Sequence, residues 1–120
     1  MVNIVDGNIL NCTEDIICHQ VNIQGYMGGG VARQLANRYI NLEKEYSEHC
    51  KVLENKYKLL KGNVFFYKEN NKIICNMFSQ KENFDTDYEA MKIALEEIKQ
   101  YAKVFKLSIC MPYRHRLWNS

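Results

Sequence analysis

The chain has 120 residues, of which 47% are hydrophobic and 25% are charged, and its formal net charge is +2. This length and composition are typical of one compact globular domain and exclude a disordered chain. Positive and negative residues are interspersed, and no apolar run has the length of a membrane span or the pattern of a secretory signal. We therefore expect neither a membrane partner nor direct nucleic-acid binding.

The cysteines are odd in number, scattered, and without a Cys-x-x-Cys pair. They are Cys12, Cys18, Cys50, Cys75 and Cys110. This spacing favours neither a disulfide framework nor a metal site, so we expect no metal and a reducing, cytoplasmic location. We also expect no cofactor. Three of the five lie in apolar runs, where a thiol behaves as a small core residue.

Taken in order, the chain alternates predicted strands with predicted helices. Short apolar runs predict strands over residues 2–5, 16–18, 63–67, 73–78 and 107–111. Amphipathic runs predict helices over residues 30–38 and 42–53, and a third that opens within residues 85–89. A hairpin-like turn is expected over residues 69–72. The alternation implies an α/β sandwich with a largely parallel central sheet.

Two of these helices show a clear apolar face. In the second helix this face consists of Leu42, Tyr46, Cys50 and Leu53, and in the third of Met91, Leu95, Ile98, Ala102 and Phe105. Thr86 and Glu89 have the spacing of a capping box at the start of the third helix. His49 falls in a charged stretch and is expected at the surface.

A glycine-rich loop separates the strand at 16–18 from the helix at 30–38. It contains Gly25 and the triplet Gly28-Gly29-Gly30. Backbone N–H groups at a helix N-terminus bind anions, and a phosphate can approach because glycine has no Cβ. A tight turn before a helix is the alternative. Neither the P-loop nor the dinucleotide fingerprint fits, since Val31 and Ala32 follow the triplet and Arg33 takes the place of the third fingerprint glycine.

Several motifs in a fixed order resemble those of the macrodomain family. They are Gly7-Asn8-Ile9-Leu10, His19-Gln20-Val21-Asn22, the segment 25–32, Asn76-Met77-Phe78-Ser79-Gln80 and Met111-Pro112-Tyr113. The resemblance spans about residues 2–113 and is greatest to the branch of ADP-ribose 1''-phosphate phosphatases and terminal ADP-ribose glycohydrolases. It implies a three-layer α/β/α sandwich with a mixed, largely parallel sheet. The implied small-molecule ligand is ADP-ribose or ADP-ribose 1''-phosphate, with ADP-ribosylated macromolecules as further candidate partners.

The resemblance also implies roles for individual residues. The implied ligand-binding residues are Asn8, Ile9, Asn22, Gly28, Gly29, Gly30, Val31, Ala32 and Phe78, and the implied catalytic residues are His19, Asp85 and Asp87. His19 would act as a general acid/base, because its ordinary pKa lies near neutrality. Asp85 or Asp87 would orient a water, with helix capping as the alternative for both. Asn8 stands where the family often has an aspartate that reads adenine, and an ordinary turn residue is its alternative.

The end of the chain departs from the family pattern. Macrodomains continue after Met-Pro with a second glycine-rich loop, a helix and a last strand, whereas residues 114–120 read Arg-His-Arg-Leu-Trp-Asn-Ser. One choice among the synonymous codons for the last six residues, CAT AGG CTG TGG AAT AGC, gives Ile-Gly-Cys-Gly-Ile-Ala when the first base is dropped. We therefore divide the chain into a truncated macrodomain, residues 1–113, and an off-pattern tail, residues 114–120, which a single-base insertion would explain.

This departure leaves three functions open. The chain could hydrolyse ADP-ribose 1''-phosphate or a related ester, as the intact family form would, or read ADP-ribose without chemistry, or be an inactive fragment. The glycohydrolase route is not expected, because the lysine that it uses after the fourth strand is replaced by Ser79-Gln80. Whether this chain is an enzyme therefore stays undecided from the sequence.

Overall fold

The computed structural model describes residues 2–5 and 9–112, and within this part a five-stranded sheet forms the centre. The strands are β1 (Val2–Val5), β2 (Ile16–Val21), β3 (Val64–Glu69), β4 (Lys72–Phe78) and β5 (Ile109–Pro112). Their order across the sheet is β1-β5-β2-β4-β3. All neighbours are parallel except β3, which pairs antiparallel with β4. The predicted mixed, largely parallel sheet is thus confirmed.

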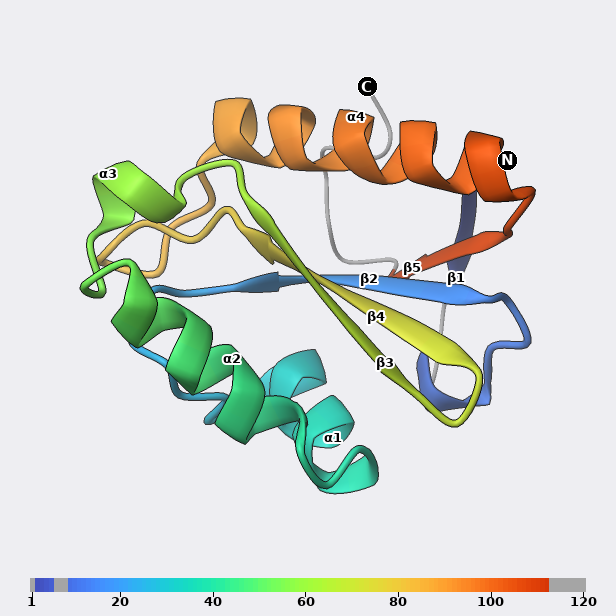
Figure 1. Cartoon of the computed structure of the whole chain (residues 1–120), viewed down its shortest axis with the longest axis horizontal. Helices are drawn as coiled ribbons and strands as arrows, with labels where there is room; N and C mark the ends of the chain where they lie inside the picture. Colours follow the sequence, from blue (N-terminus) through green and yellow to red (C-terminus); the bar gives the residue numbers. More distant parts are fainter. Residues whose placement is uncertain (1, 6–8, 113–120) are drawn as a thin grey trace.

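Helices cover both faces of this sheet (Figure 1). They are the 3₁₀ turn η1 (Ile9–Asn11) and the helices α1 (Gly30–Arg38), α2 (Leu42–Val52), α3 (Tyr57–Leu60) and α4 (Tyr88–Phe105). Figure 1 shows α4 along one face, with α1 and α2 against the other. This is the predicted three-layer α/β/α arrangement. The two shortest helical elements, η1 and α3, were not predicted, because helical runs this short show no periodicity.

Alternation along the strands divides the apolar side chains between two cores. In β2, Ile17 and Val21 belong to the core under α1 and α2, whereas Ile16 and Cys18 belong to the core under α4. Such two-sided burial is typical of strands in a sheet that helices cover on both faces. Cys18, Cys75 and Cys110 are fully buried, as predicted for thiols in apolar runs.

Four local predictions are corrected by the structure. Strand β2 continues past the apolar run 16–18 to Val21, so His19, which we expected at the end of the strand, lies two residues before it. The N-cap of α4 is Asp87 rather than Thr86, and its carboxylate accepts a hydrogen bond from Ala90 N. Phe105 is 59% exposed, since the apolar stripe of α4 drifts away from the sheet at its last turn. His49 is half-buried and stacks on Phe65, with ring centroids 4.8 Å apart.

Of the remaining local predictions, the hairpin turn is confirmed, and the others concern residues that the structure does not describe. The turn after β3 contains Asn70 and Asn71 at φ 52 and 64, which is the backbone of a two-residue hairpin. Asn8, Tyr113 and the tail 114–120 lie outside the described residues. Among the helices of residues 2–5 and 9–112, none combines the length and apolarity that crossing a membrane requires.

Candidate functional site

The glycine-rich loop, residues 22–29, leaves the carboxyl end of β2 and leads directly into α1. Strand β4 is parallel to β2, with Val21 opposite Phe78, so the segment 79–87 leaves the same edge of the sheet (Figure 1). Ligands of α/β sheets bind beyond the carboxyl ends of parallel strands. Two buried side chains, Ile23 and Met27, anchor the loop in the core below it. The loop therefore occupies the expected edge in a fixed position.

Helix α2 holds the loop from beneath through side-chain hydrogen bonds. The Tyr46 hydroxyl lies 2.5 Å from the backbone oxygen of Asn22 and 2.8 Å from its Oδ1. Glu43 Oε2 accepts from Met27 N at 2.6 Å, and Glu43 Oε1 also pairs with Arg33 Nη2 at 3.3 Å. These contacts join both ends of the loop to one helix.

The side chain of Asn22 is occupied within the loop. Its Oδ1 also accepts from Gln24 N at 2.8 Å, and its Nδ2 donates to the backbone oxygen of Tyr26 at 3.2 Å. Just beyond, Gly25 has φ +78, and a Cβ there would lie 2.9 Å from Ser47 Oγ of α2. Backbone conformation and close approach both require glycine at this position. Asn22 and Gly25 thus shape the loop.

The glycine triplet is exposed and opens onto solvent at the start of α1. Gly30 has φ +57, which side chains rarely adopt, but Gly29 has φ −156, an extended value open to any residue. Among the described residues, nothing lies within 4 Å of a Cβ built on Gly29. Neither backbone strain nor protein contacts therefore explain glycine at position 29.

The open space at Gly29 adjoins the N-terminus of α1. The first hydrogen bond of the helix runs from Arg33 N to Gly29 O at 3.2 Å. The backbone N–H groups of residues 30–32 come before it and therefore have no acceptor within the helix. Gly29 is the N-cap and supplies no side chain to these groups. Val31 and Ala32 are half-buried and pack on the core, which fixes the first turn. The result is an electropositive backbone site that an anion can reach.

His19 lies inside β2, two residues before its end, and is only 1% exposed. It pairs across the sheet with Asn76 of β4, and its Nε2 lies 2.6 Å from Asn76 Oδ1. Asn76 Nδ2 in turn donates to the backbone oxygen of Phe65 at 2.9 Å. The imidazole is thus fixed in the sheet below the loop, on the face that α2 covers.

The two candidate aspartates lie at the start of α4, on the other face of the sheet from α1. Asp85 is exposed and forms a local turn with Asn83, which donates to its carboxylate at 3.0 Å. Asp87 is buried, and Tyr57 donates to its carboxylate at 2.7 Å, with Lys61 Nζ at 3.4 Å. Burial opposes ionisation of Asp87, but the hydrogen bonds from Ala90 N and Tyr57 and the Lys61 charge outweigh it and lower its pKa. Asp87 therefore caps the helix, the alternative that the sequence left open.

The two apolar candidates lie in the core. Phe78 is fully buried, where it stacks on Tyr46 and His49 with centroids 5.9 and 5.8 Å apart. Ile9 is buried within η1 and packs in the same core. In this conformation both support the site from within. Among the predicted ligand-binding residues that the structure describes, the exposed ones are consequently Gly28, Gly29 and Gly30.

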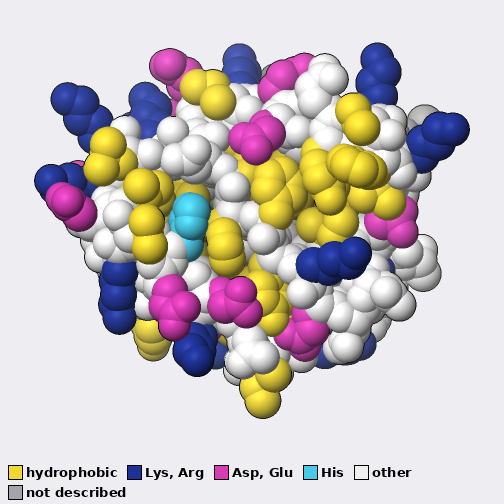
Figure 2. All heavy atoms as spheres, viewed as in Figure 1, with side chains coloured by type: hydrophobic (Ala, Val, Ile, Leu, Met, Phe, Trp, Pro, Cys, Tyr) yellow, Lys and Arg dark blue, Asp and Glu magenta, His cyan; other side chains and the backbone are white. Residues whose placement is uncertain are grey.

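Two features with titratable side chains were not predicted from the sequence: the half-buried His49 and a cluster of three potential metal ligands. Burial lowers the pKa of His49, whose Nε2 has no hydrogen-bond partner among the described residues. Cys12, Glu14 and Cys110 converge from distant parts of the chain. Neither could be found by local spacing, since each depends on contacts between elements far apart in sequence. On the face shown in Figure 2, basic and acidic side chains are scattered among one another.

Comparisons with known proteins give a consistent fold. No family model matches the chain. An ADP-ribose 1''-phosphate phosphatase of Saccharomyces cerevisiae (strain YJM789) is 32% identical across 83% of this chain, which spans 61% of the yeast protein. The macrodomain of Mycobacterium tuberculosis DarG superposes with a TM-score of 0.79 at 22% identity, over 93% of this chain and 75% of its own.

A third comparison is with Thermosipho africanus DarTG, whose structure is a complex with ADP-ribose. It superposes with a TM-score of 0.73 at 16% identity, over 92% of this chain and 32% of its own. Both structural superpositions cover more than nine-tenths of this chain. The chain therefore has the macrodomain fold.

Proposed function

We propose that the chain binds ADP-ribose or an ADP-ribose derivative, with the diphosphate held by the main chain of residues 28–32. The observation that carries this proposal is the open space at Gly29, for which the described residues give no internal reason. A diphosphate there would accept hydrogen bonds from N–H groups of the first turn of α1 and interact favourably with the helix dipole. The fold shared with an ADP-ribose-bound protein supports the choice of ligand.

The other ligand residues enter the proposal with different roles. The family resemblance assigns Asn8 to recognition of the adenine. The Asn22 side chain already hydrogen-bonds to the backbone of Tyr26 and Gln24. We therefore assign Asn22 the role of shaping the loop, and not of contacting the ribose. Phe78 and Ile9 would support the site from the core. The partner is then ADP-ribose itself, free or attached to a macromolecule, and the free thiols suit a reducing cytoplasm.

Calorimetric titration tests this proposal. ADP-ribose should bind with 1:1 stoichiometry, and AMP, which lacks the diphosphate and the distal ribose, should bind at least about 10-fold more weakly. Equal affinities for the two nucleotides would mean that the diphosphate makes no contact. Absence of binding to a chain that is folded by circular dichroism would identify an inactive fragment.

Hydrolysis of ADP-ribose 1''-phosphate is a second candidate function, favoured by the identity with the yeast phosphatase. In this reading His19 is the general acid/base, and Asp85 or Asp87 orients the attacking water. The 1% exposure of His19 and the capping contacts of Asp87 favour the non-catalytic reader instead. If His19 is catalytic, His19→Ala should lower phosphate release about 10²-fold while ADP-ribose affinity stays within a few-fold. Equal loss of affinity and turnover would assign it a structural role.

A further inference from the structure

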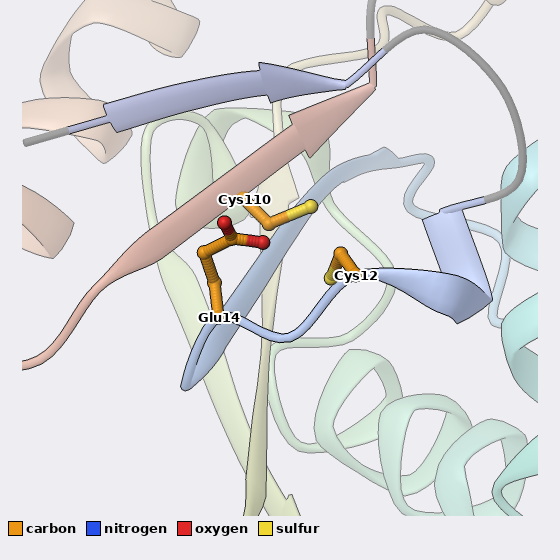
Figure 3. Close-up of side chains that lie close together, drawn as sticks. All are labelled: Cys12, Glu14 and Cys110. Atoms are coloured by element: carbon orange, nitrogen blue, oxygen red, sulfur yellow. The ribbon is translucent and has the colours of Figure 1, made fainter.

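Three potential metal ligands meet beside β5, outside the glycine-rich loop. Cys12 follows η1, Glu14 precedes β2, and Cys110 lies on β5. Their sulfur and carboxylate oxygen atoms all lie within 4.8 Å of one another. Figure 3 shows the three side chains converging from the two segments. Cys110 is fully buried, whereas Cys12 and Glu14 are half-buried, so the group has one core side and one side open to solvent.

The chemistry of these ligands selects a class of cation. Two sulfurs and one carboxylate oxygen suit Zn²⁺, whereas Mg²⁺ and Ca²⁺ prefer oxygen alone. Zn–S bonds of about 2.3 Å in tetrahedral geometry place two sulfurs about 3.8 Å apart. The atoms here lie within 4.8 Å, so contraction of at most about 1 Å, within reach of side-chain rotation, would form the site. A water would complete the tetrahedron.

Neighbouring groups complement such a site in charge and orientation. Two thiolates and a carboxylate around Zn²⁺ leave one net negative charge. The Lys72 ammonium balances it, since Nζ donates to the backbone oxygen of Cys12 at 3.1 Å and to that of Glu14. Asn3 Nδ2 donates to Glu14 Oε2 at 3.0 Å, which leaves Oε1 to face a metal.

We propose that Cys12, Glu14 and Cys110 bind one Zn²⁺ ion. The metal would join the turn between η1 and β2 to β5, two segments from opposite ends of the described chain. Because the unfolded chain does not hold these ligands together, the binding free energy would add to the stability of the fold. This site is independent of the proposed ADP-ribose loop.

The test uses the full chain, kept reduced with a phosphine and dialysed against Zn²⁺. We expect one Zn²⁺ per chain by elemental analysis and a raised melting temperature. Cys12→Ser and Glu14→Gln should each weaken Zn²⁺ binding about 10-fold or more. Both positions are half-buried, so these variants should fold, which circular dichroism checks. Cys50→Ser, which removes a thiol outside the group, should bind Zn²⁺ as the parent does.

Cobalt(II) supplies an independent readout, because thiolate–cobalt bonds give an intense near-ultraviolet charge-transfer band. The band should appear with the parent and with Cys50→Ser, and weaken in Cys12→Ser. Failure of the reduced, folded parent to bind Zn²⁺ would overturn the proposal. Equal binding by Cys12→Ser and the parent would do the same.

Discussion

The Tyr46 hydroxyl of α2 lies 2.5 Å from the backbone oxygen of Asn22 and 2.8 Å from its Oδ1, so one phenol holds the first residue of the glycine-rich loop. Burial raises the pKa of Tyr46 well above its ordinary value, so the hydroxyl stays a neutral donor. The same ring stacks on Phe78 in the core. A single side chain thus couples the packing of α2 to the position of the loop.

Tyr46→Phe should test this coupling, because it removes the hydroxyl and keeps the ring. We expect the free energy of unfolding to fall by about 1–2 kcal/mol, since the Asn22 oxygens lose a buried donor. ADP-ribose affinity should fall several-fold as the loop loosens. Urea denaturation and calorimetry measure the two effects.

Tyr57→Phe is the matched control, since it also removes a phenol hydroxyl from a side-chain hydrogen bond. The Tyr57 hydroxyl donates to Asp87 and not to the loop. Its loss should lower stability and leave ADP-ribose affinity unchanged. If both variants weaken binding equally, the loop does not depend on Tyr46 specifically.

The His19–Asn76 pair predicts a measurable coupling energy. Its side chains meet at 2.6 Å, and both residues are at most 1% exposed. His19→Ala and Asn76→Ala should each cost about 2–4 kcal/mol of unfolding free energy through a cavity and an unsatisfied partner. In a double-mutant cycle by urea denaturation, the double variant should cost less than the sum by about 0.5–3 kcal/mol. Simple additivity would show that the contact contributes nothing specific.

The lowered pKa of Asp87 predicts that the free energy of unfolding depends on pH. Its pKa is lowered in the folded chain, so the stabilisation is fully present above the ordinary value of 3.8 and is lost as the pH falls through the lowered folded value. Asp87→Ala should cost about 1 kcal/mol at neutral pH through loss of the cap. The difference from the parent should shrink below about pH 4. Thermal unfolding across this range measures it, with Asp85→Ala as the exposed control; a difference independent of pH would contradict the assignment.

Much of the fold follows from local sequence pattern. The helix predicted over residues 30–38 matches α1, and the apolar face Leu42, Tyr46 and Cys50 is buried as expected. Periodicity suffices for these elements because burial of one helix face is decided within a few turns. The three layers and the largely parallel sheet follow from the alternation of strands and helices together with the family motifs, whereas the order of the strands required the structure.

The features that sequence pattern did not predict all depend on contacts between segments that are distant in the chain. Strand β2 runs past His19 because its backbone pairs with β4 as far as Val21 and Phe78, which the sequence of β2 does not reveal. His49 is half-buried because aromatic rings of β3 and β4 lie beneath it. Cys12 and Cys110 meet only because η1 folds beside β5. The loop was predicted from its glycines, but which of them faces open space required the structure.

The central claim is that the N-terminus of α1 binds the diphosphate of ADP-ribose, and Gly29→Asp tests it most directly. Aspartate is a preferred N-cap residue and adopts the extended backbone found at Gly29, so stability should be unchanged or slightly higher. Its carboxylate would occupy and repel the proposed anion site. The control Asn41→Asp places the same added charge at the N-cap of α2.

Calorimetric titration of ADP-ribose into the three proteins is the decisive measurement. We predict that Gly29→Asp lowers the affinity at least about 100-fold, or about 2.7 kcal/mol, while Asn41→Asp binds within about 2-fold of the parent. Undiminished binding by a folded Gly29→Asp variant would contradict the account, because a diphosphate at the start of α1 could not tolerate that carboxylate.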